Sequence, residues 1–341
     1  MKKTISVLLC VILFAGIMVP VCSAGTLPLS SGIDALRDQF GDGSGPSVNG
    51  VVMDYCYFVP DLEEGQKYPL VIWLHGLVSG GYPRRQITKN DISYWSSAEF
   101  QSRFSAGGAF ILAPRSPEAV AAWADTMQAP LKSTIISFIR LYLDKIDTTR
   151  IYIGGLSVGA QMTLKMVAAY PEMFAAAFPC SPYGTVNSDL ANGCANTPIW
   201  ELSSKNDYLM GFTTWIQPEW NNLMAKNKRR SDCRWTVMET AMKPDGTATG
   251  TTHDTWYAAT YDMFMTDNKP FYNSVTYDGN GKVVELTYPN GLISWLNNFT
   301  TSYTISPGAQ AKDNVFTRIY KAIIEWITGI VKALGLKGIL G

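Results

Sequence analysis

The stretch Arg150-Ile-Tyr-Ile-Gly-Gly-Leu-Ser-Val-Gly-Ala160, continued by Gln161-Met-Thr-Leu-Lys-Met-Val-Ala-Ala-Tyr170, decides the fold of this chain. Ile151 to Ile153 is a short β-branched and aromatic run that predicts a strand, and a helix-forming run begins just beyond Ser157. Two glycines lie between them, so the chain has to turn sharply at the serine. The sequence therefore predicts a strand, a tight turn and a helix in immediate succession.

Within this stretch, Gly155-Leu-Ser-Val-Gly159 fits the Gly-x-Ser-x-Gly pattern of a nucleophilic serine held in a strained turn. Glycines flank the serine because a Cβ at either position would clash with the strand or the helix. The hydroxyl of Ser157 is then presented at the carboxyl end of the strand. An ordinary glycine-rich turn is the alternative, but the strand, turn and helix around the motif favour a nucleophile.

Residues 1–24 have the pattern of a secretory signal: two lysines, an apolar run and the small residues Cys22-Ser-Ala24. We expect cleavage after Ala24 and a secreted or extracellular protein, with association to the cell surface left open. Retention of the apolar run as an anchor, or a lipid on Cys22, are the alternatives, although Val19-Pro-Val21 is a poor lipoprotein pattern.

The near-neutral charge balance gives no indication of a nucleic-acid partner, since binding to phosphates requires an excess of basic residues. Removing Lys2 and Lys3 from 28 positive charges leaves 26 against 28 negative ones, a net charge of −2. Residues 25–299 are enough for one large catalytic domain with a substantial core. We interpret residues 300–312 as a linker.

The C-terminal segment, residues 313–341, predicts a strongly amphipathic helix. One half of the helical wheel is apolar and consists of Val315, Phe316, Ile319, Ile323, Trp326, Ile327, Ile330 and Val331. The other half carries the charged residues Arg318, Lys321, Glu325 and Lys332. With four charges it is not suited to span a bilayer. Three roles stay open: peripheral membrane contact, docking on another protein, or packing on its own domain.

Four cysteines remain after the signal: Cys56, Cys180, Cys194 and Cys233. An even number suits an oxidising exterior. Cys180 and Cys194 bracket a loop rich in Ser, Pro, Gly and Asn, so we predict a disulfide between them. The other pairings, and four free buried thiols, stay open.

Strand-like and helix-like segments alternate along the rest of the chain. The predicted strands are 51–59, 67–74, 107–114, 174–178, 197–203 and 234–239, and the predicted helices are 131–143, 219–226 and a short one at Trp295-Leu296. This alternation predicts an α/β fold with a mainly parallel central sheet and helices on both faces. Asp278-Gly-Asn-Gly281 predicts an inserted β-hairpin within 271–289, which we expect at the surface near the site entrance.

A nucleophilic serine needs a base, and imidazole is the usual one because its pKa lies near neutrality. The chain has two histidines. Hydrolases built on this turn carry serine, acid and histidine in that order, so the base must be His253. We interpret His75, which follows a predicted buried strand, as a structural residue of its loop.

The acid must reach the far nitrogen of the His253 imidazole. The carboxylates considered are Glu172, Asp189, Glu201, Asp207, Glu219, Asp232, Glu239 and Asp245. We predict Asp207 because it follows a buried strand in a short polar turn, with Asp245 as the second candidate. An exposed aspartate capping a helix is the other interpretation of Asp207.

An oxyanion hole would be formed by the backbone N–H of Leu77, or a neighbour, and that of Val158. This chemistry requires no metal and no organic cofactor. Aromatic side chains are candidates to line an acyl or sugar pocket, although burial in the core is the commoner fate. The candidates are Tyr82, Trp95, Trp123, Tyr183 and Trp256.

These motifs resemble the secreted α/β-hydrolase esterases grouped with polyhydroxybutyrate depolymerases and feruloyl or acetylxylan esterases, with features of prolyl-oligopeptidase-like serine hydrolases. The segments that carry the resemblance are Leu74-His-Gly76, Gly155 to Gly159, Ser204-Lys-Asn-Asp207, His253-Asp-x-Trp256 and Trp295-Leu296. The resemblance covers roughly residues 50 to 300 and implies an α/β-hydrolase fold. Ala160 stands where the family usually has a second glycine, and the hairpin looks like an insertion that leaves the substrate open.

The combined prediction is a secreted serine esterase that cleaves carboxylic esters through a triad of Ser157, His253 and Asp207 and an acyl-enzyme. Its expected partner is an ester substrate, which includes polymeric esters such as polyesters and feruloyl or acetyl polysaccharides. Two alternatives stay open: a serine peptidase with the same triad, and a non-catalytic surface-binding protein on a hydrolase scaffold.

Overall fold

The computed structural model describes residues 31–77, 83–117, 123–266, 269–270, 272–287 and 291–306. The predicted signal (1–24), the C-terminal segment (313–341), residues 307–312 of the linker and Tyr82 lie outside these ranges. Within them, no helix has the length and apolar character needed to cross a membrane. Tyr303 and Ile305, in the first half of the predicted linker, pack against the hydrophobic core.

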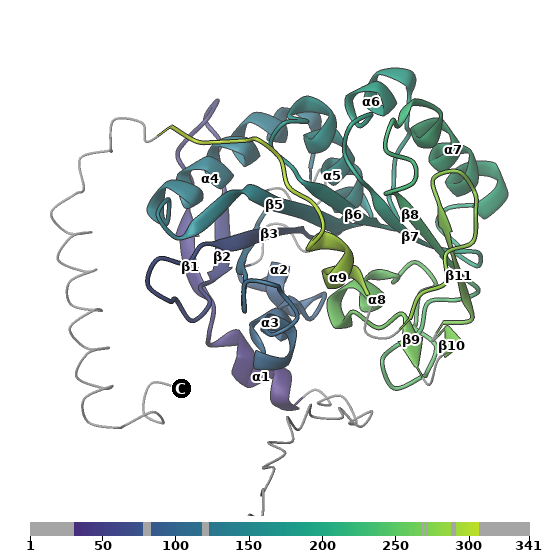
Figure 1. The fold of residues 1–341 in the computed structure, drawn as a ribbon, viewed down its shortest axis with the longest axis horizontal. Coiled ribbons are helices and arrows are strands. Elements are labelled where there is room, and N and C mark those ends of the chain that lie inside the picture. The colour runs from purple at the N-terminus through teal and green to yellow at the C-terminus, as the bar shows by residue number, and fades with distance from the viewer. Residues whose placement is uncertain are drawn as a thin grey trace, which may run out of the picture.

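A central sheet organises the described residues (Figure 1). Its order is β1 (Gly41–Ser44), β2 (Asp54–Phe58), β4 (Phe110–Pro114), β3 (Tyr68–Leu74), β5 (Ile146–Leu156), β6 (Ala176–Cys180), β7 (Trp200–Ser204), β8 (Arg234–Met238) and β11 (Ser274–Asp278). Neighbouring strands from β4 to β8 are parallel, and β1, β2 and β11 pair antiparallel. The predicted mainly parallel sheet is confirmed. A separate two-stranded ribbon joins β9 (Met265–Thr266) to β10 (Lys269–Pro270).

Helices cover both faces of this sheet (Figure 1). One face carries α4 (Gln128–Leu141), α5 (Val158–Ala169), α6 (Ser188–Gly193) and α7 (Gln217–Lys226). The other face carries α1 (Ser31–Arg37), α2 (Arg85–Thr88), α3 (Ala98–Gln101), α8 (Trp256–Tyr261) and α9 (Leu292–Leu296). Short 3₁₀ turns occur at Ile92–Ser96 and Asp125–Met127, and a π turn at Phe212–Ile216 precedes α7.

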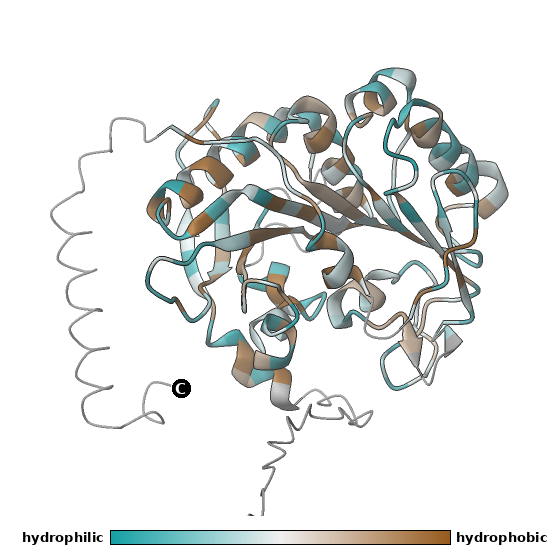
Figure 2. Ribbon diagram, in the orientation of Figure 1, coloured by the Kyte–Doolittle hydropathy of each residue, from teal (hydrophilic) through white to brown (hydrophobic). Residues whose placement is uncertain are grey.

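The side chains of β3 show how the two cores form. Leu70, Ile72 and Leu74 point into the core beneath α4 and α5, and Val71 and Trp73 point into the core beneath α8 and α9. All seven residues of the strand are buried, so the continuous apolar run of the sequence reflects burial on both faces. Figure 2 shows this apolar character along the centre of the sheet.

The predicted hairpin is present, but it does not lie where we expected it. Its turn is present, because the N–H of Asp278 donates to the carbonyl of Lys282 at 2.8 Å. Its first arm, however, is β11, which pairs with β8 as an edge of the central sheet, and its second arm makes a single bridge, Tyr277 to Val283. β11 ends at Asp278, opposite Arg234, so the turn lies at the amino end of β8. The predicted place near the site entrance was wrong, because the candidate site residues follow the carboxyl ends of the parallel strands, and the hairpin instead covers the outer edge of β8.

The predicted disulfide between Cys180 and Cys194 was wrong: both thiols are free and buried, as are Cys56 and Cys233. The physical reason is the sheet itself. Cys180 lies in the core under α8 and α9, and Cys194 lies in the core on the opposite face, where its Sγ donates to the carbonyl of Leu164 at 3.4 Å. The segment between the two cysteines is short, but it connects cores on opposite faces of the sheet, so the two thiols cannot meet.

Glu201 is a buried carboxyl group in the middle of β7. It is 3 % exposed, and its Oε1 accepts a hydrogen bond from Ser203 Oγ at 2.9 Å. Burial raises the pKa of Glu201 to about 8, the nearby carboxylate of Glu219 adds to the increase, and the Ser203 hydrogen bond opposes it. The protein therefore holds a proton on Glu201 that the unfolded chain releases at a lower pH.

Glu201→Gln should remove a pH dependence of folding stability. Because the folded pKa lies above the ordinary glutamate pKa of 4.5, the contribution of Glu201 to the free energy of unfolding is present below about pH 4.5 and is lost as the pH rises through about 8. Urea denaturation at pH 5 and pH 9 should show a wild-type loss on the order of several kcal/mol that shrinks in the variant. The exposed Glu64→Gln is the control; equal pH dependence in all three proteins would contradict this account.

Candidate active site

Ser157 connects β5 to α5 with φ 58° and ψ −120°, a left-handed conformation that is unusual for a residue with a side chain. Its backbone is held from both sides: its N–H donates to the carbonyl of Cys180 at 3.0 Å, and its carbonyl accepts from the N–H of Tyr183 at 3.1 Å. The strained turn predicted from the sequence is therefore fixed against the end of β6.

The glycines of the turn allow a close approach between α5 and the end of β3. A Cβ on Gly159 would lie 2.2 Å from the carbonyl oxygen of Leu74 and 2.5 Å from that of His75. A Cβ on Gly155 would lie 2.6 Å from the oxygen of Leu74. Backbone atoms leave no room for adjustment, so these two positions require glycine.

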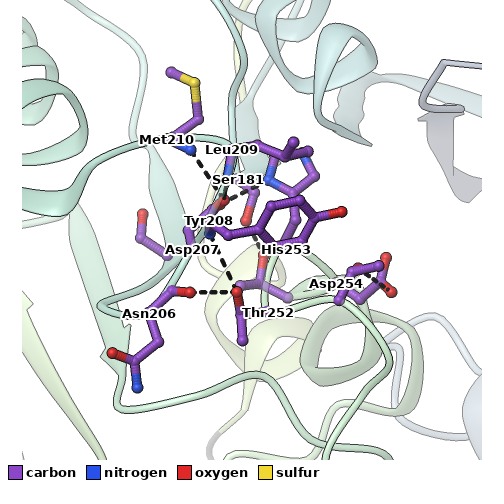
Figure 3. Close-up of polar contacts among 12 residues, drawn as sticks. Ser181, Asn206, Asp207, Tyr208, Leu209, Met210, Thr252, His253 and Asp254 are labelled. Carbon is purple, nitrogen blue, oxygen red and sulfur yellow. Dashed lines mark hydrogen bonds and ion pairs between the residues drawn. The ribbon is translucent and has the colours of Figure 1, made fainter.

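Asp207 and His253 form a buried pair (Figure 3). The Nδ1 of His253 lies 2.6 Å from Oδ2 of Asp207, and each residue is 5 % exposed. The other carboxylate oxygen, Oδ1, accepts from the N–H groups of Leu209 (2.9 Å) and Met210 (3.1 Å). Because a carboxylate accepts, Nδ1 donates to Asp207, which leaves Nε2 of His253 as the nitrogen that can take up a proton.

That Nε2 atom is buried and has no hydrogen-bond partner among the described residues, Ser157 included. The sheet nevertheless brings the two loops to one edge: Ser157 follows β5, Asp207 follows β7, and β6 lies between these strands. Carboxyl ends of parallel strands are where open α/β sheets place their sites. The catalytic roles of Ser157, Asp207 and His253 are predictions.

Two threonines on either side of His253 tie its loop to its neighbours. Thr252 Oγ1 accepts from the N–H of Tyr208 at 3.2 Å and donates to the carbonyl of Asn206, so it spans the residues flanking Asp207 (Figure 3). Thr255 Oγ1 lies 2.9 Å from Ser181 Oγ, at the end of β6. The sequence did not reveal these contacts, because hydroxyl residues in loops have no periodic pattern.

The loop after β3 is organised by His75. Its Nε2 accepts from the N–H of Ser116 at 3.1 Å, and its Nδ1 donates to the carbonyl of Gly76 at 2.7 Å. Burial lowers the pKa of His75 to about 4, so the ring is neutral at pH 7. Trp123 donates through Nε1 to the His75 carbonyl at 2.7 Å. With both nitrogens engaged, His75 has the structural role that was expected.

The proposed oxyanion donors lie on either side of the close contact between the start of α5 and the end of β3. Leu77 follows the His75-Gly76 segment, whose start contacts the α5 end at Gly159. Val158 is the first residue of α5, and an N–H at that position has no acceptor inside its helix. The arrangement suits a pair of backbone donors, and their role remains a prediction.

The predicted pocket aromatics divide into two groups. Trp95, Trp123 and Trp256 are buried, 1 %, 3 % and 4 % exposed, and Trp256 Nε1 donates to Asp254 at 3.0 Å. Tyr183 is 48 % exposed, beside the Ser157 backbone, and the neighbour of Asp207, Tyr208, is 66 % exposed. The exposed pair is thus better placed to meet a large substrate than the buried tryptophans.

The second candidate acid, Asp245, is not brought to His253. Its carboxylate is exposed and accepts hydrogen bonds from Thr247, which lower its pKa. Across the described ranges, no cluster of three or more His, Cys, Asp or Glu side chains is arranged to hold a metal ion.

Curated relatives match parts of the chain. Acetylxylan esterase A from Aspergillus ficuum is 30% identical over 110 residues, which cover 30% of this chain and 34% of that protein. Probable acetylxylan esterase A from Aspergillus clavatus is 26% identical over 162 residues, covering 45% of this chain and 46% of that protein. The chain therefore spans a third to a half of the length of these relatives. No protein-family profile matches it.

Among solved structures, a thermostable esterase is similar with a TM-score of 0.54 and 26% sequence identity, covering 67% of this chain and 61% of that chain. This likeness and the sheet order agree: the chain has the α/β-hydrolase fold that the sequence motifs implied.

Gly159→Ala should destabilise the protein by at least about 2 kcal/mol, because the added methyl meets the backbone oxygens of Leu74 and His75. Gly250→Ala is the matched control: a Cβ at Gly250 meets nothing within 4 Å and its φ is not positive, so we expect a change within about 0.5 kcal/mol. Chemical denaturation of both variants measures the difference. Equal stabilities would refute the packing described for the turn.

Proposed function

We propose that the protein is a serine hydrolase that cleaves carboxylic esters through an acyl-enzyme. The observation that carries this proposal is the buried Asp207–His253 pair, whose free Nε2 lies on the same sheet edge as the strained Ser157 turn. The partial similarity to two acetylxylan esterases and to a thermostable esterase supports the ester-cleaving class.

In this mechanism, the Ser157 hydroxyl attacks the ester carbonyl carbon while His253 Nε2 takes up its proton. Asp207 accepts the Nδ1–H and stabilises the imidazolium that forms. The backbone N–H groups of Leu77 and Val158 bind the developing oxyanion. The alcohol leaves with the proton from His253, and the acyl group stays on Ser157. Water then attacks the acyl-enzyme while His253 takes up its proton, and the carboxylic acid is released as Ser157 regains a proton from His253.

The surroundings favour an ester on a bulky or polymeric compound, such as an acetylated or feruloylated polysaccharide or a polyester. Leu77, Tyr183 and Tyr208 are 46 %, 48 % and 66 % exposed and lie next to the loops of the site. Large exposed apolar side chains grouped at one edge mark a contact surface. The proposal includes two further steps outside the site. Residues 1–24 are removed and the protein is released from the cell, and residues 313–341 form a separate helix that contacts a membrane.

Ser157→Ala should lower kcat on esters by roughly 10³ to 10⁶, because the nucleophile is lost. The measurement is a panel of p-nitrophenyl, acetylxylan, feruloyl and hydroxybutyrate esters, with p-nitroanilides as amide counterparts to detect peptidase activity. Ser188→Ala, an exposed serine on α6, is the control and should retain full activity. Unchanged ester turnover in Ser157→Ala would refute the mechanism.

Thr252→Val should lower kcat/KM by about tenfold or more with a smaller effect on KM, because it releases the two hydrogen bonds that hold the Asp207 turn against the His253 loop. A positioning role also predicts a shift in the pH profile of kcat/KM, and its recovery in Thr252→Ser. The exposed Thr300→Val is the control. A normal pH profile in Thr252→Val would argue against this role.

A further inference from the structure

A second concave site lies away from the Ser157 turn, at the β11 edge of the sheet. It is a cleft of about 560 Å³ between α7 and the strands β8 and β11, which Figure 1 shows together at that edge. One end begins at Lys205, whose N–H donates to the carbonyl of Met238 at the carboxyl end of β8. The other end is closed by Arg230 and the Gly279 to Gly281 turn. The cleft therefore runs along β8 and opens two residues from Asp207.

The cleft has an aromatic floor. The rings of Phe212 and Trp235 stack with centroids 5.6 Å apart and planes at 4°, and Trp220 stacks on Trp235 at 5.5 Å and 19°. Tyr277 stands across from Trp235 in the β8–β11 register and is partly exposed. Trp220 and Trp235 are buried, 4 % and 6 % exposed, so the partly exposed rings of Phe212 and Tyr277 form the surface that a ligand can reach. Aromatic rings that line a concave surface offer apolar surface that suits the C–H faces of sugar rings.

Polar side chains surround this floor. Gln217 and Asn221 are one helical turn apart on the face of α7 that lines the cleft, and Asn280 faces them from the hairpin turn. Side-chain amides both donate and accept, which matches the donor and acceptor capacity of sugar hydroxyls. An aromatic floor with an amide rim thus favours a saccharide over a purely apolar ligand.

The charges of the cleft are positive. Lys205 and Arg230 line it, and no carboxylate among the described residues does. Lys205 is paired with Glu239 at 2.5 Å, whereas Arg230 makes no ion pair with another described residue. The Nε of Arg230 donates to the carbonyl of Met224 at 2.6 Å, which anchors the guanidinium at the end of α7. An anchored, uncompensated guanidinium suits a carboxylate.

Backbone hydrogen bonds and a close backbone contact hold the wall opposite α7 in place. Gly279 donates to the carbonyl of Arg230 at 2.8 Å, and a Cβ on Gly279 would lie 2.7 Å from that oxygen. The Asp278 carboxylate accepts from the N–H groups of Asn280 and Lys282, both at 2.9 Å. A preformed cleft reduces the ordering that binding requires.

We propose that this cleft binds an acidic saccharide, a sugar chain that carries carboxylate groups, with the rings on the aromatic floor and a carboxylate at Arg230. The site is separate from the Ser157 turn, so this proposal does not depend on the proposed esterase activity. A saccharide held here would lie close to the edge that carries Asp207.

Calorimetric titration of the full chain with trigalacturonate, and with the neutral xylotriose, tests the proposal. We expect trigalacturonate to bind with a Kd below about 1 mM, at least tenfold tighter than xylotriose, and more weakly as NaCl is raised. Arg230→Ala should weaken trigalacturonate binding at least tenfold, and Asn221→Ala should weaken both sugars. Hydrolysis of p-nitrophenyl acetate, if the wild type shows it, should be unchanged in these variants.

Arg140→Ala, an exposed arginine on α4, is the matched control and should bind like the wild type. Thermal denaturation of each variant checks that it folds. The proposal is overturned if trigalacturonate does not bind, if xylotriose binds equally well, or if Arg230→Ala and Arg140→Ala behave alike. Binding without ester hydrolysis would remove the esterase proposal and leave this one standing.

Discussion

The left-handed turn at Ser157 is the constraint on which the rest of the candidate site depends. The turn exists because Gly155 and Gly159 let α5 approach the carbonyls at the end of β3, closer than any side chain permits. Two backbone hydrogen bonds then hold residue 157 against the end of β6. A side chain in a strained conformation persists only where its surroundings fix it in this way, and such sites are enriched in function.

The two histidines show how position in the fold separates structure from chemistry. His75 uses both ring nitrogens within its own loop and stays neutral because it is buried. His253 uses one nitrogen on Asp207 and leaves the other without a partner among the described residues. Thr252 and Thr255 tie the His253 loop to the segments that follow β7 and β6. Histidine thus has a structural role in the loop after β3 and is a candidate general base in the loop that contains His253.

Much of the fold was predictable because buried parallel strands are continuous apolar runs, as in Tyr68 to Leu74, and because the turn needs its glycines. The Asp207–His253 contact was predicted from chain order and the scarcity of histidine. The free thiols of Cys180 and Cys194 were not predicted, because only the folded sheet shows that they lie on opposite faces. The aromatic cleft also escaped prediction, since its residues come from α7, β8 and β11, far apart in sequence.

The central claim is that Ser157 is a hydroxyl activated by His253. Reaction with a fluorophosphonate, followed by peptide mass mapping, tests it directly, because such reagents form a covalent bond only with an activated serine. The account predicts one adduct, on the peptide that contains Ser157, and a rate that falls by orders of magnitude in His253→Ala. No adduct, an adduct on another serine, or an unchanged rate in His253→Ala would contradict it.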